Sequence, residues 1–259
     1  MSLDWPLILA FHHIDPKRSS RYVLAVDRLE RELHHMLELG FKALTLPEAL
    51  ARGPHGSRDA KERTFTVTFD DGLSSFASLA VPVLERLDLV AATTIFVPTK
   101  WVGQDNAWRE EPTLLQRLAP WGETEERLLG WEEIGDLAAR GFTFESHGHG
   151  HVAMNKLSYD DALADLMTSR SLLADHGIMA RYFAWPYGWH SPDSKRAVSD
   201  AGFEAALSVK WGGHDILEAR RIPIYGTDHA ITRRLKLSGR YFDAFDTAAR
   251  LAGKKRYRR

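Results

Sequence analysis

Cysteine is absent from this sequence, which excludes disulfide bonds and thiolate metal ligands. A charge imbalance is absent as well: the formal net charge is -1 with 27% charged residues, so no overall field attracts nucleic acid or a membrane surface. Long hydrophobic runs are also lacking, because the apolar run Leu7–Phe11 is too short for a signal peptide or a membrane span. As written, the sequence predicts a cytoplasmic protein without an integral membrane segment, although a trimmed export signal would leave the same sequence.

Apolar β-type runs alternate with amphipathic helical stretches along the chain. Seven strands are expected at residues 7–12, 42–46, 64–69, 92–97, 143–146, 182–185 and 205–209, and an eighth at 222–225. This alternation favours an α/β fold with a mainly parallel sheet, and such repetition in 259 residues suits a single TIM-like barrel domain. No Gly-x-Gly-x-x-Gly turn indicates a dinucleotide fold. The longest irregular stretch, 98–126, is predicted to be a functional loop.

Several helix boundaries can be read from end signals. Asp27 can cap a helix that stops at Gly40, and Ser158 can cap one that stops at Gly177. Ser191–Pro192 opens a third helix, with proline at its first position. The strongly basic residues 254–259 are predicted to be a solvated tail, with attachment to anionic lipid or nucleic acid as the alternative.

Two adjacent carboxylates, Asp70 and Asp71, follow the predicted strand 64–69. Strands disfavour aspartate and neighbouring anions repel, so the pair is costly unless something at the strand end uses it. The other such pair, Asp160–Asp161, follows Ser158 at a predicted helix start, where carboxylates offset the macrodipole. The first pair therefore predicts a functional role at the barrel rim, with a plain Asp–Gly turn as the alternative.

A histidine-rich loop, Ser146–His151, follows another predicted strand. Its glycines disfavour a helix and allow His147 and His151 to meet one ion, although polar loop histidines without a ligand are the alternative. Two imidazole nitrogens and one carboxylate with an open fourth position describe a catalytic site for one divalent metal ion. Zinc is favoured, with cobalt, nickel or manganese as other candidates. The remaining aspartate is then placed to act as a general base.

Two further segments end predicted strands. After the strand at 182–185, the turn Pro186–Gly188 either points a backbone N–H at a developing oxyanion or is a plain turn. At the end of the first strand, alternation predicts that only one of His12 and His13 faces the barrel rim. Polar groups thus fall at the ends of several separate strands.

Together, these motifs resemble the polysaccharide deacetylase superfamily, the carbohydrate esterase family 4 or NodB-like domains. The matching residues are Thr68–Gly72, Ser146–His147 with His151 and Lys156–Ser158, and Phe183–Gly188. The resemblance covers roughly residues 5–227 and implies a distorted (β/α)7 barrel. The roles that it implies are Asp70 as general base, Asp71, His147 and His151 as metal ligands, and the backbone N–H of Tyr187 as an oxyanion donor.

The sequence departs from the family pattern in two places. Ala184 stands where many relatives have the arginine of an Arg-x-Pro-Tyr motif, which predicts that the catalytic base lacks its usual partner. The family's late Leu-x-His motif, the source of the general acid, is not evident, so His12 is predicted to be the acid or an orienting group. The motif Phe-Ala-Trp-Pro-Tyr-Gly is similar to the corresponding motif of the branch that deacetylates β-1,6-linked poly-N-acetylglucosamine.

The resemblance implies a metal-dependent hydrolase that removes an N-acetyl group from an amino sugar, a polysaccharide or a glycoconjugate. Because aromatic rings stack on sugar faces, Trp185 and Trp189 are predicted substrate contacts, together with Pro186 beside Trp185. No nucleic-acid partner is expected. Two other classes stay open: a different C–N hydrolase that acts on a formyl group or a small cyclic amide, and a non-catalytic glycan-binding relative.

Overall fold

One parallel sheet organises the chain in the computed structural model, which describes residues 6–53, 63–106, 126–209, 215–238 and 241. The strand order is β10-β9-β8-β7-β6-β5-β1-β11, and β4 pairs with β5 outside this path. The strands are β1 (Leu7–Phe11), β4 (Lys42–Ala43), β5 (Thr64–Phe69), β6 (Thr93–Val97), β7 (Thr143–Ser146), β8 (Tyr182–Ala184), β9 (Ala205–Ser208), β10 (Ala219–Arg220) and β11 (Ile222–Pro223). Every pairing in this sheet is parallel, as the alternating sequence predicted.

The two edges of the sheet meet at one short segment. Strands β10 and β11 lie at opposite ends of the strand order, yet only Arg221 separates them along the chain. Ala219 pairs with Leu207 of β9, and Ile222 pairs with Leu9 of β1. The closing segment, Ala219–Pro223, therefore hydrogen-bonds to both edges and makes the sheet a nearly closed barrel. The predicted single-domain α/β barrel is confirmed.

All eight predicted strand positions contain a strand. The sequence did not reveal β10, nor β2 (His13–Asp15) and β3 (Val23–Ala25), which pair in a separate two-stranded sheet. These strands are two or three residues long, too short for a periodic pattern. Much of the predicted functional loop, residues 107–125, and the basic tail at 254–259 lie outside the described residues.

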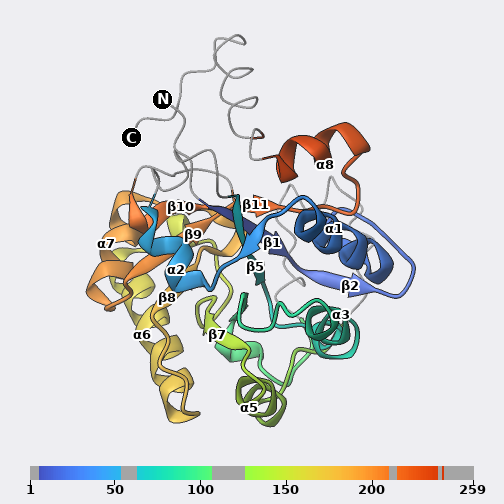
Figure 1. The fold of residues 1–259 in the computed structure, drawn as a ribbon. Coiled ribbons are helices and arrows are strands. Elements are labelled where there is room, and N and C mark those ends of the chain that lie inside the picture. The colour runs from blue at the N-terminus through green and yellow to red at the C-terminus, as the bar shows by residue number, and fades with distance from the viewer. Residues whose placement is uncertain (1–5, 54–62, 107–125, 210–214, 239–240, 242–259) are drawn as a thin grey trace.

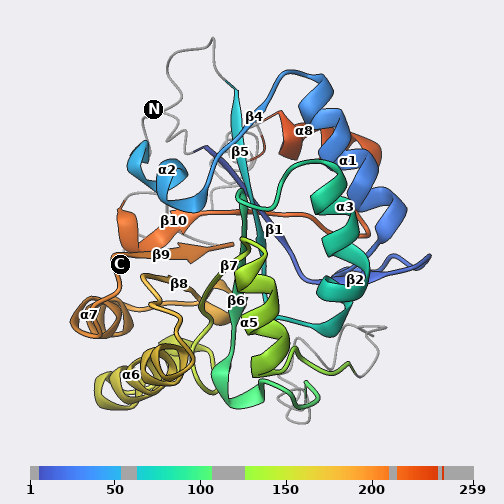
Figure 2. The same cartoon turned by 60° about the horizontal axis from the view of Figure 1, so that its bottom comes forward.

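Helices lie around the outside of the sheet (Figures 1 and 2). They are α1 (Val26–Glu38), α2 (Leu46–Ala51), α3 (Val81–Arg86), α5 (Trp131–Ala139), α6 (Tyr159–Asp175), α7 (Pro192–Asp200) and α8 (Ala230–Leu237). Ser158 and Ser191 cap α6 and α7 as predicted. The predicted cap Asp27 is wrong: Ala25 is the N-cap of α1, and Asp27 lies in the first turn, where it pairs with Arg31. Among the described helices, none is long and apolar enough to cross a membrane.

The apolar core has two parts. The larger packs the outer face of the sheet against the helices. The smaller fills the barrel interior and includes Leu46 and Leu50 of α2 together with Ile8 and Tyr182, which lie near the starts of their strands. Helix α2 therefore covers the amino end of the barrel, and the carboxyl end is left for polar side chains.

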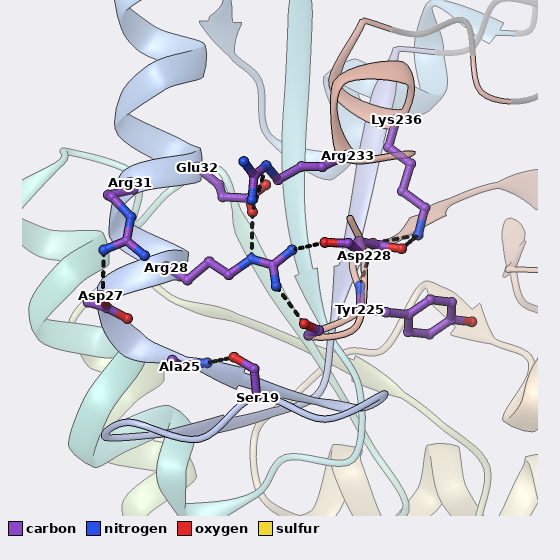
Figure 3. A network of polar contacts seen from close by, with 11 residues as sticks. Ser19, Ala25, Asp27, Arg28, Arg31, Glu32, Tyr225, Asp228, Arg233 and Lys236 are labelled. Carbon is purple, nitrogen blue, oxygen red and sulfur yellow. Dashed lines mark hydrogen bonds and ion pairs between the residues drawn. The ribbon is translucent and has the colours of Figure 1, made fainter. Parts of the chain in front are cut away.

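A polar network joins α8 and the preceding loop to α1 (Figure 3). Arg28 of α1 donates to Glu32 Oε1 at 2.9 Å and to the backbone oxygens of Gly226 and Asp228 at 2.5 and 2.9 Å. Lys236 of α8, only 1% exposed, donates to both carboxylate oxygens of Asp228 at 2.8 and 2.6 Å. Its third hydrogen bond, of 2.7 Å, goes to the carbonyl of Pro223 at the end of the closing segment.

Replacing Lys236 by methionine is expected to lower the free energy of unfolding by about 3–5 kcal/mol, because the buried carboxylate of Asp228 loses its cation. Urea denaturation measures the loss. The matched control is Arg234→Met, since Arg234 is an exposed cation on the same helix and its replacement should change stability by less than about 0.5 kcal/mol. Equal stability of the two variants would contradict a structural role for this network.

Candidate active site

The predicted site residues gather at the carboxyl ends of neighbouring parallel strands. Asp70 and Asp71 directly follow β5, His12 follows β1, His147 follows β7, and Trp185 follows β8. Because parallel strands all end at the same rim of a barrel, residues far apart in sequence meet there. The structure thereby brings the carboxylate pair and the histidine loop together.

Asp71, His147 and His151 form a buried cluster in which three ligand atoms lie within 4.8 Å of one another. The Oδ1 atom of Asp71 is 3.1 Å from Nε2 of His151 and 3.6 Å from Nε2 of His147. The two imidazole rings are 4.9 Å apart at 65°. The spacing predicted from the sequence thus brings both histidines to the same carboxylate.

The protonation states of this cluster suit a cation. Burial lowers the pKa of His147 to about 4, so its ring is neutral at neutral pH. Its Nδ1 lies 2.8 Å from the carbonyl of Ala184, which can only accept, so Nδ1 carries the hydrogen and Nε2 offers a lone pair. Burial alone would raise the pKa of Asp71, but His151 and the neighbouring histidines hold it well below its usual range.

The oxygen at the centre of the cluster tests whether these residues fit a metal ion. Asp71 Oδ1 is buried and accepts no hydrogen bond of normal geometry within the described part of the chain. It faces two imidazole nitrogens instead. Since buried polar atoms are nearly always satisfied, an anionic oxygen and two nitrogens in this arrangement fit one divalent cation.

The backbone at the site adopts conformations that most residues avoid. Four non-glycine residues have positive φ in the described ranges, and three of them are predicted site residues: Asp71 (73°), His151 (56°) and Tyr187 (59°). Such conformations cost free energy and concentrate at functional sites. The glycine after the carboxylate pair is required sterically, because a Cβ on Gly72 would lie 2.6 Å from Cγ1 of Val97.

Asp70 is 3% exposed and bound by an arginine that the sequence analysis missed. Arg221, 0% exposed, donates to Asp70 Oδ1 at 2.6 Å and to Oδ2 at 2.8 Å. Burial would raise the pKa of Asp70, but the charge of Arg221 outweighs it and the pKa is lowered. The usual arginine is absent at position 184, as the sequence shows, but Asp70 has an arginine partner from elsewhere in the chain.

Arg221 comes from the closing segment, where the two edges of the barrel meet. Ala184, where the family motif led us to expect an arginine, supplies its carbonyl to His147. A motif search around residue 184 could not find Arg221, since 37 residues separate the two positions. The available signal was a charged residue directly before the predicted strand at 222–225, a costly position unless the charge is paired.

His12 and His13 have different surroundings, as strand alternation predicted. Nε2 of His12 lies 3.7 Å from Oδ2 of Asp70, and its side chain is 18% exposed. His13 is buried, and its Nδ1 lies 2.5 Å from Oε2 of Glu126. Only His12 therefore adjoins the carboxylate pair, and its role as a general acid stays a prediction.

The Pro-Tyr-Gly turn lies beside the metal-ligand candidates, since the ring of Tyr187 is 4.9 Å from that of His151.

The three predicted sugar contacts differ in how far they are buried. Trp185 is 1% exposed and its Nε1 donates to the carbonyl of Leu217, so protein covers its ring, and Pro186 is buried too. This burial argues against sugar stacking on these two residues. Trp189 is half-buried, and its sugar contact stays a prediction.

Comparison with known proteins agrees with this arrangement. The family model described as polysaccharide deacetylase matches residues 57–206. The Bacillus subtilis protein YxkH, provisionally described as a polysaccharide deacetylase, is 24% identical over 208 residues, which cover 79% of this chain and 64% of YxkH. This chain thus corresponds to less than two thirds of that relative's length.

Solved structures share the fold. The Streptococcus pyogenes deacetylase PplD, determined in complex with acetate, has a TM-score of 0.68 at 18% identity and covers 86% of this chain and 93% of its own. IcaB from Ammonifex degensii has a TM-score of 0.69 at 19% identity, with 92% of this chain and 97% of its own covered. At these identities the likeness shows the barrel architecture alone.

Proposed function

Because this chain belongs to the polysaccharide deacetylase family, we propose that it is a metal-dependent hydrolase that removes an N-acetyl group from an amino sugar in a glycan or glycoconjugate. The observation that carries the proposal is the buried Asp71, His147 and His151 cluster beside a carboxylate, Asp70, that a buried arginine holds in place. A ligand cluster and a separate base are the two parts that hydrolysis of an amide requires.

The donor set favours a transition-metal ion over calcium or magnesium, because two imidazole nitrogens and one carboxylate oxygen are offered in place of an oxygen cage. Zinc is the proposed ion, with cobalt, nickel and manganese as alternatives. When bound, a divalent ion acts as a Lewis acid that lowers the pKa of water and polarises a carbonyl oxygen. Asp71, His147 and His151 would hold it.

Asp70 is proposed to remove the proton from the attacking water. Arg221 uses one lone pair on each carboxylate oxygen, so a lone pair remains on each oxygen to accept a proton. The pKa of Asp70 is lowered, so the carboxylate is ionised before the reaction. The arginine therefore fixes the orientation of the base without blocking it.

The amide carbon gains a bond to the water oxygen, and its carbonyl oxygen becomes an oxyanion. The backbone N–H of Tyr187, next to His151, is proposed to donate to that oxyanion. When the C–N bond breaks, the amine nitrogen takes a proton, and His12 is the proposed donor because its Nε2 lies 3.7 Å from Asp70 Oδ2. The products are acetate and a free amine.

Removal of the metal tests this proposal. Stripping the protein with a chelator is expected to abolish acetate release from N-acetylglucosamine oligomers, and about one equivalent of zinc, cobalt or nickel should restore it. His151→Ala should lose both metal and activity, because it removes a ligand. The control is His35→Ala, which removes an exposed histidine on α1 and should change neither.

Two results would contradict the proposal. In the first, metal binds at one equivalent and no acetate is released with any ion. The protein would then hydrolyse a formyl group or a small cyclic amide, or bind a glycan without turnover. If activity persists in the chelated protein, the metal-dependent mechanism is wrong.

A further inference from the structure

The link Gly148–Gly150 joins the two histidines of the candidate metal centre. Positive φ at Gly148 (81°), in the link, and at His151 (56°), directly after it, turns the chain sharply. A link of this kind is held only by what surrounds it, because its turns leave the backbone groups unpaired with one another. The position of His151 relative to His147 therefore depends on hydrogen bonds from neighbouring elements.

The carbonyl oxygens of the link all accept hydrogen bonds from the turn after β6, Thr99–Trp101. Thr99 N donates to Gly148 O and Lys100 N donates to His149 O, each at 3.0 Å. Trp101 Nε1 donates to Gly150 O at 3.2 Å. One side of the link is thus tied to the end of the neighbouring strand.

Two N–H groups of the link face the other way, toward α6. The N–H of His149 donates to Oδ1 of Asp165 at 2.8 Å, and the N–H of Gly150 donates to Oδ2 of the same carboxylate at 2.7 Å. The N–H of Gly148 donates to Ser146 Oγ at 3.1 Å. Every backbone polar group of the link is therefore satisfied, and one carboxylate accounts for two consecutive donors.

The glycines of the link make room for this carboxylate. A Cβ on Gly148 would lie 2.9 Å from Oδ1 of Asp165, and a Cβ on Gly150 would lie 3.2 Å from Oδ2. The helix that carries Asp165 is anchored, since Ala162 and Leu166 of α6 are fully buried. The carboxylate therefore has a defined position against the link.

We infer that Asp165 is a positioning residue for the metal centre: by binding the N–H groups of His149 and Gly150, its carboxylate sets the position of His151 relative to His147 and so the distance between their Nε2 atoms. Hydrogen bonds from N–H groups to an ionised carboxylate are about twice as strong as neutral ones, so this contact can hold a conformation with left-handed residues. The inference rests on the metal centre of the proposed function and not on the substrate.

The test is a metal titration of Asp165→Asn. Asparagine has the same size, but its amide nitrogen cannot accept, so one of the two N–H groups of the link loses its acceptor. The dissociation constant for Co²⁺ is expected to rise by about 10–100-fold, and the visible absorption of bound Co²⁺ should change as the ligands move. The matched control is Asp160→Asn, which removes the same charge from an exposed position of α6 and should bind Co²⁺ as the wild type does.

Circular dichroism before the titration shows whether each variant is folded. Wild-type affinity together with a wild-type Co²⁺ spectrum in folded Asp165→Asn would overturn the inference. If Asp165→Asn does not fold, Asp165→Ala takes its place, because alanine puts no amide group against the N–H, and the same two outcomes decide.

No substrate enters this titration, so its failure is distinguishable from that of the proposed function. Weakened Co²⁺ binding in Asp165→Asn, with no acetate release from the wild type, supports the inference and counts against the deacetylase alone. Wild-type binding in the variant, with acetate released by the wild type, counts against the inference alone.

Discussion

Asp70→Asn is expected to lower acetate release by about 10²–10⁴-fold, the contribution of a general base, while one equivalent of metal still binds. The carboxamide keeps the shape of the side chain but cannot take a proton from water. The ligands Asp71, His147 and His151 are unchanged. The measurement is kcat/KM on N-acetylglucosamine oligomers with zinc-loaded protein, alongside metal content.

The structure adds a control that the sequence alone would not suggest. In Asp70→Asn the guanidinium of Arg221 stays fully buried without its anion, so the free energy of unfolding should fall as well. The double variant Asp70→Asn, Arg221→Met removes both charges and is expected to regain stability without regaining activity. Asp160→Asn, from the other Asp–Asp pair, should leave activity unchanged. A folded, metal-loaded Asp70→Asn with the wild-type rate would rule out Asp70 as the base.

Arg221→Met is expected to lower the free energy of unfolding by about 3–5 kcal/mol, because the buried carboxylate of Asp70 loses its cation. It should also lower kcat by about 10–100-fold, the range found when hydrogen-bond partners of metal-site groups are removed. KM should change little, since Arg221 is fully buried and its Nη1 and Nη2 atoms already donate to Asp70 and Thr68. Urea denaturation and steady-state kinetics measure the two effects.

Two matched variants separate charge from geometry. Arg221→Lys keeps the cation but not the two parallel N–H groups, so it should be more stable than Arg221→Met and still have a reduced kcat. Arg220→Met changes the adjacent arginine, which is only half-buried and which strand alternation predicts to face away from Asp70, and should have a near wild-type kcat. Equal kcat in Arg221→Met and Arg220→Met would show that Arg221 serves stability only.

The metal-ligand candidates could be predicted because their signals are local. Asp70–Asp71 and the histidine loop each follow a readable strand, and parallel strands in a barrel end at the same rim. The prediction that they meet needed only this rule. Trp185 shows the limit of such reasoning, because the sequence around an aromatic residue does not show whether its ring faces a substrate or the core.

The sequence by itself determined the alternation of strands and helices, the identity of the three ligand candidates and of the candidate base, and the family to which the chain belongs. Only the tertiary structure decided which side chains hold these groups in place. Arg221 is 151 residues from Asp70, and Asp165 is 16 residues from His149 on a different element. Local patterns carry no information about such pairs, because the contacts form only when barrel closure and the packing of α6 bring the segments together.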